Sequence, residues 1–181
     1  IKKRSKIVGY IGRISTRKGV ENLIDAIPKI LAQVDDVSFL IGGDGPLLQQ
    51  IQKEITKRGH GRRVKILGWI PQEELVQSLN EIQLLVLPTY AEGLPTIVLE
   101  SMACGTPVLA TPVGGIPDVI LDGVTGFIME DNSPESIANN VIRAINSPNL
   151  GKIAIEARKT IDKSYSLTEA VNRYQRILKS L

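Results

Sequence analysis

The 181-residue chain is 43% hydrophobic and 23% charged, a balance that excludes a disordered, coiled-coil or collagen-like protein and allows one domain with its own core. Its formal net charge of +3 suits an anionic ligand without requiring one, and we expect no nucleic-acid partner. The single cysteine, Cys104, excludes an internal disulfide and predicts a cytoplasmic protein. No apolar run approaches the length of about 20 residues that a membrane span needs, so we expect no transmembrane segment.

Short runs of aliphatic and β-branched residues alternate with helical periodicity along the chain, and this alternation predicts βαβ units around a parallel sheet. Strands are predicted at six places: 6–12, 38–42, 64–68, 83–87, 108–110 and 125–129. Helices are predicted at 20–33, 47–57 and 72–81, from near Pro95 to before Gly105, and from Pro134 onward, with two more before the C-terminus. We therefore expect residues 1–181 to form a Rossmann-like three-layer α/β/α domain with a mainly parallel six-stranded sheet.

In an open parallel sheet of this kind, ligands bind beyond the carboxyl ends of the strands, where the strand order reverses. This rule selects five loops as candidate binding segments: 13–19, 43–46, 69–71, 90–96 and 112–118. We expect the chemistry of the protein to lie on these loops.

The segment 92–108, EGLPTIVLESMACGTPV, carries the strongest signal for a site. Glu92 lies in a loop, and Glu100 lies inside a helix that begins among glycine and proline residues. Free N–H groups at such a helix start, together with the positive end of the helix dipole, form a phosphate site. Both carboxylates could face one cleft, although most surface glutamates only contact water.

Basic side chains at the end of the first strand favour the functional interpretation. Arg13 offers a planar fork for phosphate, and Lys18 offers a point charge. Neither a Walker phosphate loop nor a G-x-G-x-x-G fingerprint is present, so we expect no dinucleotide cofactor. The chain has no Asp-x-Asp pair and no cluster of cysteine and histidine, so we expect no metal.

Three other side chains are weaker candidates. Trp69 either stacks on a nucleotide base or packs beneath its strand-end loop, and we expect the packing. His60, in a basic loop flanked by glycines, is expected to be a surface residue rather than a catalytic base. Cys104, beside Gly105, is expected to be a small core residue.

From about Ile7 through the last helix, the chain resembles the C-terminal domain of family 4 (group 1) glycosyltransferases. The segments that carry the resemblance are GRISTRKG at 12–19, GGDGP at 42–46, the strand end at 68–70, the E-x7-E pair within 92–108, and the GGIPD loop at 114–118. The resemblance implies one half of a GT-B fold, in which two Rossmann-like domains face each other. It also implies that the protein has an N-terminal domain that this chain lacks.

The resemblance further implies a donor site for a nucleoside-diphosphate sugar. Arg13 and Lys18 would bind the diphosphate, Glu100 would accept hydrogen bonds from the ribose, and Glu92 would lie beside the donor sugar, with Glu92, Arg13 and Lys18 serving catalysis. The remaining donor-binding positions are contributed largely by the backbone and are Gly12, Gly43, Trp69, Ile70, Gly93, Leu94, Thr96 and Ile97. Two positions depart from the family pattern: Asp118 stands where Glu is usual, and Ser101 where Ala is usual.

The function implied is retaining transfer of a hexosyl group from a nucleoside-diphosphate sugar to a hydroxyl acceptor, without a metal cofactor. The acceptor would be bound largely by the N-terminal domain, which could also attach the protein to a membrane surface, so we expect the isolated domain to be inactive in transfer. One alternative is a stand-alone nucleotide-sugar-binding subunit that serves a separate acceptor-binding partner. Another is a GT-B-like nucleotide-sugar epimerase, for which the sequence shows no clear acid and base groups.

The last helix, at 165–181, is predicted from a capping box formed by Ser166 and Glu169. Its apolar side chains form one stripe, made of Leu167, Val171, Tyr174, Leu178 and Leu181. We expect this stripe to pack toward the N-terminal domain and, when exposed, to promote self-association.

Overall fold

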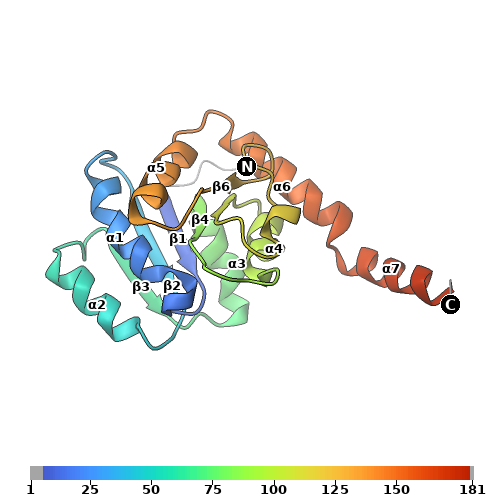
Figure 1. Ribbon diagram of the computed structural model, residues 1–181, viewed down its shortest axis with the longest axis horizontal. Coiled ribbons are helices and arrows are strands. Elements are labelled where there is room, and N and C mark those ends of the chain that lie inside the picture. Colours follow the sequence, from blue (N-terminus) through green and yellow to red (C-terminus); the bar gives the residue numbers. More distant parts are fainter. Residues whose placement is uncertain (1–5, 180–181) are drawn as a thin grey trace.

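The structure is a computed structural model that describes residues 6–179 (Figure 1). Within this range six strands form a single sheet, in which every pair of neighbours is parallel and the order is β3-β2-β1-β4-β5-β6. The strands are β1 (Ile7–Ile11), β2 (Ser38–Gly42), β3 (Val64–Gly68), β4 (Leu84–Leu87), β5 (Val108–Ala110) and β6 (Phe127–Ile128). The predicted Rossmann-like α/β fold is confirmed.

Helices cover both faces of the sheet, which gives the three predicted layers (Figure 1). They are α1 (Val20–Leu31), α2 (Leu48–Lys57), α3 (Gln72–Glu81), α4 (Thr96–Ala103), α5 (Pro134–Ile145), α6 (Leu150–Ser164) and α7 (Leu167–Lys179), with short 3-10 helices η1 (Thr16–Lys18) and η2 (Ile116–Asp118). One apolar cluster lies between the sheet and helices α1, α2 and α5, and a second lies between the sheet and helices α3, α4 and the end of α6. Strands β1, β2, β4 and β5 are buried on both faces, which is why they read as continuous apolar runs.

Two of the predicted helix ends have the expected chemistry. Ser133 caps α5, because its hydroxyl accepts a hydrogen bond from the Ser136 N–H at 3.2 Å. Gly105 follows α4 in the left-handed conformation, with φ of +67°. At α7, the Ser166 hydroxyl accepts from the Glu169 N–H as predicted, whereas the Glu169 carboxylate accepts from two arginines of its own helix.

The predicted strand 125–129 is too long, since β6 covers only Phe127–Ile128. Thr125 belongs to the turn before the strand, where its hydroxyl donates to the Val119 carbonyl and accepts from the Leu121 N–H. A side chain that satisfies backbone groups in this way competes with strand pairing.

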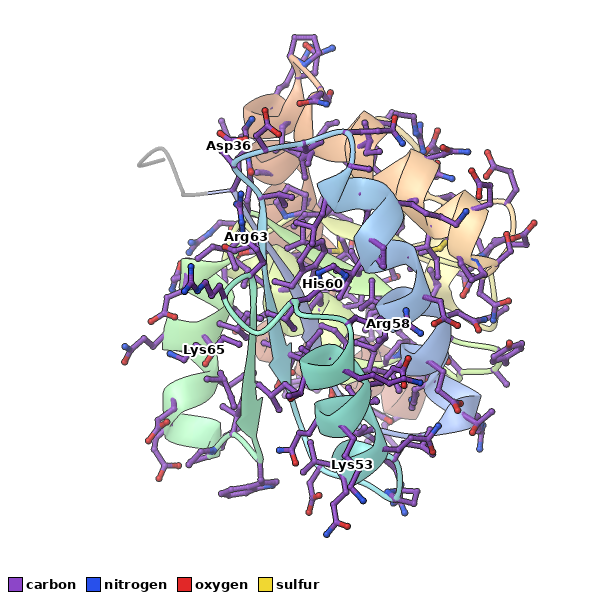
Figure 2. The ribbon with its side chains drawn as sticks, turned by 90° about the vertical axis from the view of Figure 1, so that its left-hand side faces the viewer. Asp36, Lys53, Arg58, His60, Arg63 and Lys65 are labelled. Atoms are coloured by element: carbon purple, nitrogen blue, oxygen red, sulfur yellow. The ribbon has the colours of Figure 1, made fainter. Side chains whose placement is uncertain are left out.

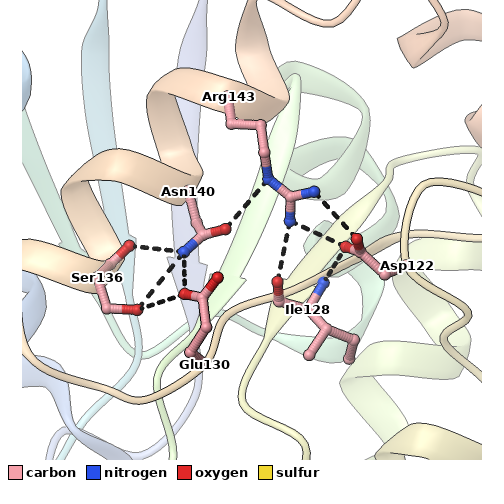
Figure 3. Close-up of polar contacts among 6 residues, drawn as sticks. All are labelled: Asp122, Ile128, Glu130, Ser136, Asn140 and Arg143. Carbon is pink, nitrogen blue, oxygen red and sulfur yellow. Dashed lines mark hydrogen bonds and ion pairs between the residues drawn. The ribbon is translucent and has the colours of Figure 1, made fainter.

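A polar network fastens this short edge strand to α5 (Figure 3). Both terminal nitrogens of Arg143 donate to Asp122, at 3.0 and 2.9 Å, and one of them also donates to the Ile128 carbonyl. This ion pair is the main reason that the pKa of Asp122 lies below its usual value. The Asn140 amide of the same helix donates to Glu130 at 2.8 Å, so α5 holds the chain on both sides of β6.

The opposite edge of the sheet is lined by charged side chains of α2 and β3 (Figure 2). Arg58 ties α2 to α1, with hydrogen bonds to Glu54 at 2.8 Å and to Asp25 at 2.6 Å. His60 lies in the turn between α2 and β3, at the amino end of the strand. His60 is half-buried rather than exposed, and this end of the sheet faces away from the candidate binding loops.

Helix α7 leads away from the rest of the molecule at the end of α6 (Figure 1). Its apolar side chains are exposed: Val171 by 45%, Tyr174 by 70% and Leu178 by 69%. The other two residues of the predicted stripe, the side chain of Leu167 and all of Leu181, lie outside the described residues. The described part of the stripe therefore has no cover within the described chain.

Candidate functional site

The strand order reverses between β1 and β4, and this reversal brings the loops after those two strands together. The Tyr90 N–H donates to the Arg17 carbonyl at 3.0 Å, and the Thr89 hydroxyl donates to the same carbonyl at 3.3 Å. Gly19 permits this approach, because a Cβ at that position would lie 1.8 Å from the carbonyl oxygen of Pro88. The loops that carry Lys18 and Glu92 are thus packed against each other.

Lys18 and Glu92 form an ion pair, with 2.5 Å between Nζ of the lysine and Oε1 of the glutamate. Their side chains are only 29% and 11% exposed, respectively, so the pair is more shielded from water than a surface ion pair. The sequence predicts both residues as site residues but not their contact, since they are 74 positions apart.

A cleft of about 340 Å³ opens beyond the ends of β1, β2 and β3, and neither Lys18 nor Glu92 is among the residues that line it. Six predicted site residues line it: Gly12, Arg13, Gly43, Trp69, Ile70 and Ile97. Its volume lies at the lower end of the range for small-molecule sites, and most of its wall is apolar. The structure therefore gathers half of the predicted site residues around one concave surface.

The sequence missed three residues that line the cleft, namely Ile11, Asp44 and Leu75. Asp44 follows Gly43 in the GGDGP segment, and its carboxylate accepts a hydrogen bond from the Gly45 N–H at 2.7 Å. Its position in a strand-end loop was a usable signal. Ile11 and Leu75 read as core residues, and no signal in the sequence separated them from the rest of the core.

The prediction that Trp69 packs beneath its loop is wrong, because its side chain is 70% exposed. Gly68 adopts φ of +70° and turns the chain at the end of β3, after which Ile70 points inward. Ile70 fills the space above Gly42, where its Cδ1 lies 2.3 Å from the position that a Cβ would occupy. Trp69 is left on the rim of the cleft.

Helix α4 begins at Thr96, with Pro95 before it and no side chain bonded to cap its first turn. Thr96 and Gly93 are exposed and Leu94 is half-buried, so the start of the helix lies near the surface. Glu100, one turn into the helix, is half-buried, and the Gln72 amide lies 3.4 Å from its carboxylate. Gln72 begins α3 and was not predicted as a site residue.

The GGIPD loop closes over the start of this segment. The Gly115 N–H donates to the Gly93 carbonyl at 2.6 Å, and a Cβ on Gly114 would lie 2.2 Å from the carbonyl oxygen of Glu92. The loop can approach Glu92 this closely because Gly114 has no side chain. Asp118, at the end of this loop, is exposed.

The two remaining residues that were singled out in α4 and after it face the core. Ser101 is fully buried, and its hydroxyl donates to the Thr106 carbonyl at 3.0 Å. That bond satisfies a polar group where the family usually has Ala. Cys104 is partly buried and packs against the second apolar cluster.

Tyr10 is a neighbour of the site that the sequence did not reveal. Its side chain is 1% exposed, and its hydroxyl donates to the Arg13 carbonyl at 2.7 Å. Burial, and to a lesser degree the nearby Glu92 carboxylate, raise the pKa of Tyr10 above its ordinary value. The hydroxyl therefore contacts the backbone of Arg13, one of the residues that line the cleft.

Among residues 6–179, no group of three or more histidine, cysteine, aspartate or glutamate side chains is placed to hold a metal ion. The described helices also include none that is both long enough and apolar enough to cross a membrane.

The chain is similar to known glycosyltransferases in sequence and in structure. The family model described as glycosyl transferases group 1 matches residues 1–161. Alpha-D-kanosaminyltransferase of Streptomyces kanamyceticus is 34% identical over 165 residues, which cover 91% of this chain and 43% of that protein. An uncharacterized glycosyltransferase of Methanocaldococcus jannaschii is 31% identical over 172 residues, which cover 95% of this chain and 47% of that protein.

Among solved structures, the HepE protein of Anabaena in complex with UDP and glucose matches with a TM-score of 0.86 and 25% identity. The match covers 98% of this chain and 49% of that one. The chain thus spans a little under half the length of each of these three proteins.

Proposed function

Because the chain belongs to the glycosyl transferases group 1 family, we propose that it is the donor-binding domain of a retaining glycosyltransferase. The donor is a nucleoside-diphosphate sugar, and the acceptor is a hydroxyl group. The observation that carries this proposal is that Arg13 lines one cleft with Ile97 of α4, while Lys18 pairs with Glu92 in the loop before that helix.

This arrangement suits a diphosphate that leaves during the reaction. Negative charge grows on the diphosphate as the glycosidic bond breaks, and fixed positive groups lower the energy of that state. The Arg13 guanidinium supplies two parallel donors, and the N–H groups at the start of α4 supply the positive end of a helix dipole. Lys18, which we also assign to the diphosphate, is paired in the free chain with Glu92, which we place beside the donor sugar.

We place the base and the ribose of the donor at the end of the site away from the diphosphate. We place the base in the cleft bordered by the backbone of Trp69 and Ile70, where apolar side chains cover its faces. Glu100 accepts hydrogen bonds from the ribose, and the Gln72 amide beside it steadies the carboxylate. We propose that the protein itself supplies the charge that balances the diphosphate, so that no divalent metal is needed.

Transfer requires an acceptor site that this chain does not provide. We propose that the whole protein has a second domain that binds the acceptor and covers the exposed apolar side of α7. Holding the donor alone leaves the acceptor unpositioned, so the isolated chain should hydrolyse its donor slowly at most. We place the protein in the cytoplasm, since its single cysteine fits a reducing compartment.

The test of this function is the effect of Arg13→Ala on the binding of UDP, GDP and ADP, measured by calorimetry. Loss of a charge-assisted hydrogen bond costs roughly 1.5–3 kcal/mol, or about ten- to a hundred-fold in affinity. Arg62→Ala is the matched control, because Arg62 is also an exposed arginine but lies at the amino end of β3. Equal affinities for wild type and Arg13→Ala would remove Arg13 from the site.

A further inference from the structure

Tyr10 occupies an unusual position for a polar side chain, within the first apolar cluster and at 1% exposure. A buried phenol must direct its hydroxyl to a hydrogen-bond partner, whereas phenylalanine would fill the same space without one. The partner here is the carbonyl of Arg13, 2.7 Å away and three residues along the chain. Packing of the core accounts for the aromatic ring but not for the hydroxyl group.

The backbone around Arg13 shows what the hydroxyl does. On one side the Gly12 N–H donates to the Gly42 carbonyl, and on the other the Ile14 N–H donates to the Asp44 carbonyl. These bonds hold the chain to the end of β2 and to the loop after it, one on each side of Arg13, and the Arg13 carbonyl accepts instead from Tyr10. Three hydrogen bonds thus fix the backbone around Arg13, whose side chain lies at the rim of the cleft.

Gly12 lies beside the Tyr10 hydroxyl. A Cβ on Gly12 would lie 3.7 Å from the Tyr10 hydroxyl oxygen, in ordinary contact. The hydroxyl is also close enough to Glu92 for that carboxylate to act on its ionisation.

We propose that Tyr10 is a positioning residue of the phosphate site, whose hydroxyl holds the Arg13 carbonyl so that the guanidinium faces the diphosphate. The inference rests on the proposed function, since it assigns Tyr10 a role in the same donor site. Tyr10 does not touch the donor, and its effect passes through Arg13. Its loss should therefore weaken recognition of the phosphates and leave recognition of the nucleoside intact.

The experiment compares Tyr10→Phe with wild type in binding UDP, GDP and ADP and the matching nucleosides, uridine, guanosine and adenosine. Binding is followed by the fluorescence of Trp69, the single tryptophan of the chain, which lines the cleft. We expect Tyr10→Phe to bind the preferred nucleoside diphosphate three- to tenfold more weakly and the nucleoside equally well. Tyr165→Phe, at a partly buried tyrosine of the second cluster, should match wild type for both ligands.

A double-mutant cycle separates positioning from a general effect on the core. In an Arg13→Ala background, Tyr10→Phe should no longer change the affinity for the nucleoside diphosphate, because the residue through which it acts is gone. An equal loss for nucleoside and nucleoside diphosphate, no loss in Tyr10→Phe, or the same loss with and without Arg13 would each overturn the inference. Failure of the wild-type chain to bind any of the three nucleoside diphosphates would instead overturn the proposed function.

Discussion

The ion pair between Lys18 and Glu92 predicts that Glu92→Gln tightens the binding of a free nucleoside diphosphate. In the structure the carboxylate holds the ammonium group that we assign to the diphosphate, at 2.5 Å. Glutamine keeps the shape of the side chain but removes the charge that competes for Lys18 and repels the phosphates.

The size of the effect follows from the exposure of the pair. Two unit charges 4 Å apart interact by about 4 kcal/mol at an effective dielectric constant of about 20. Water screens part of this, because the Lys18 side chain is 29% exposed. Rearrangement of the site on binding offsets a further part of this interaction energy. We therefore expect Glu92→Gln to gain about 1 kcal/mol of binding free energy, or about fivefold in affinity.

The assay is calorimetric titration of wild type and Glu92→Gln with UDP, GDP and ADP. Glu135→Gln serves as the control, because it removes the same charge from the Lys29–Glu135 pair, whose side chains are 46% and 65% exposed on the surface of α1 and α5. The control should bind as wild type does. Equal or weaker binding by Glu92→Gln would refute the assignment of Lys18 to the diphosphate.

Three further predictions test the site and the packing beneath it. Glu100→Gln should weaken binding of the preferred nucleoside diphosphate about ten- to a hundred-fold in calorimetry, because a charge-assisted bond to the ribose is lost; unchanged affinity would contradict that contact. Gly19→Ala should lower the free energy of unfolding in urea by roughly 2 kcal/mol or more beyond the loss in Gly59→Ala. Both glycines have a positive φ, but only a Cβ at Gly19 would meet a backbone oxygen, that of Pro88. Similar losses in the two variants would contradict this role of Gly19. The pKa of Tyr10 is raised in the folded chain, so above a pH of about 10 the phenol loses its proton first in the unfolded chain, and the free energy of unfolding should fall by up to about 1.4 kcal/mol per pH unit. Urea unfolding at pH 9 and 11 should show a smaller fall in this free energy for Tyr10→Phe than for wild type. Equal falls would contradict this prediction.

The strands were predictable because parallel strands covered on both faces are continuous apolar runs. The predicted ranges 38–42, 64–68 and 108–110 coincide with β2, β3 and β5. The range 125–129 was too long, because a strand propensity does not show that the Thr125 hydroxyl is bonded within the preceding turn.

The location of the candidate site was predictable because the binding rule for parallel sheets needs only the order of the strands. The rule predicted that Arg13, Gly43 and Ile70 lie at the same end of the sheet, and all three line one cleft. Contacts between distant loops were not predictable, as with Lys18 and Glu92, which meet only because β1 and β4 are neighbours in the sheet.

Side-chain direction was the other part that the sequence could not supply. Trp69 points outward because Gly68 adopts a positive φ, and a glycine in the sequence permits that conformation without requiring it. The partner of the Tyr10 hydroxyl likewise depends on how the chain turns after β1. A tyrosine within an apolar strand reads as core, so the hydroxyl gave no sign of its role.

The central claim, a donor site that needs no metal, is tested most directly by calorimetric titration of the chain with UDP-glucose, GDP-mannose and ADP-glucose in the presence of EDTA. We predict that at least one of these nucleotide sugars binds with a stoichiometry of about one, and that added Mg²⁺ does not tighten it, because Arg13, Lys18 and the start of α4 supply the positive charge. Absence of binding to all three, or binding that appears only when Mg²⁺ is restored, would contradict the claim.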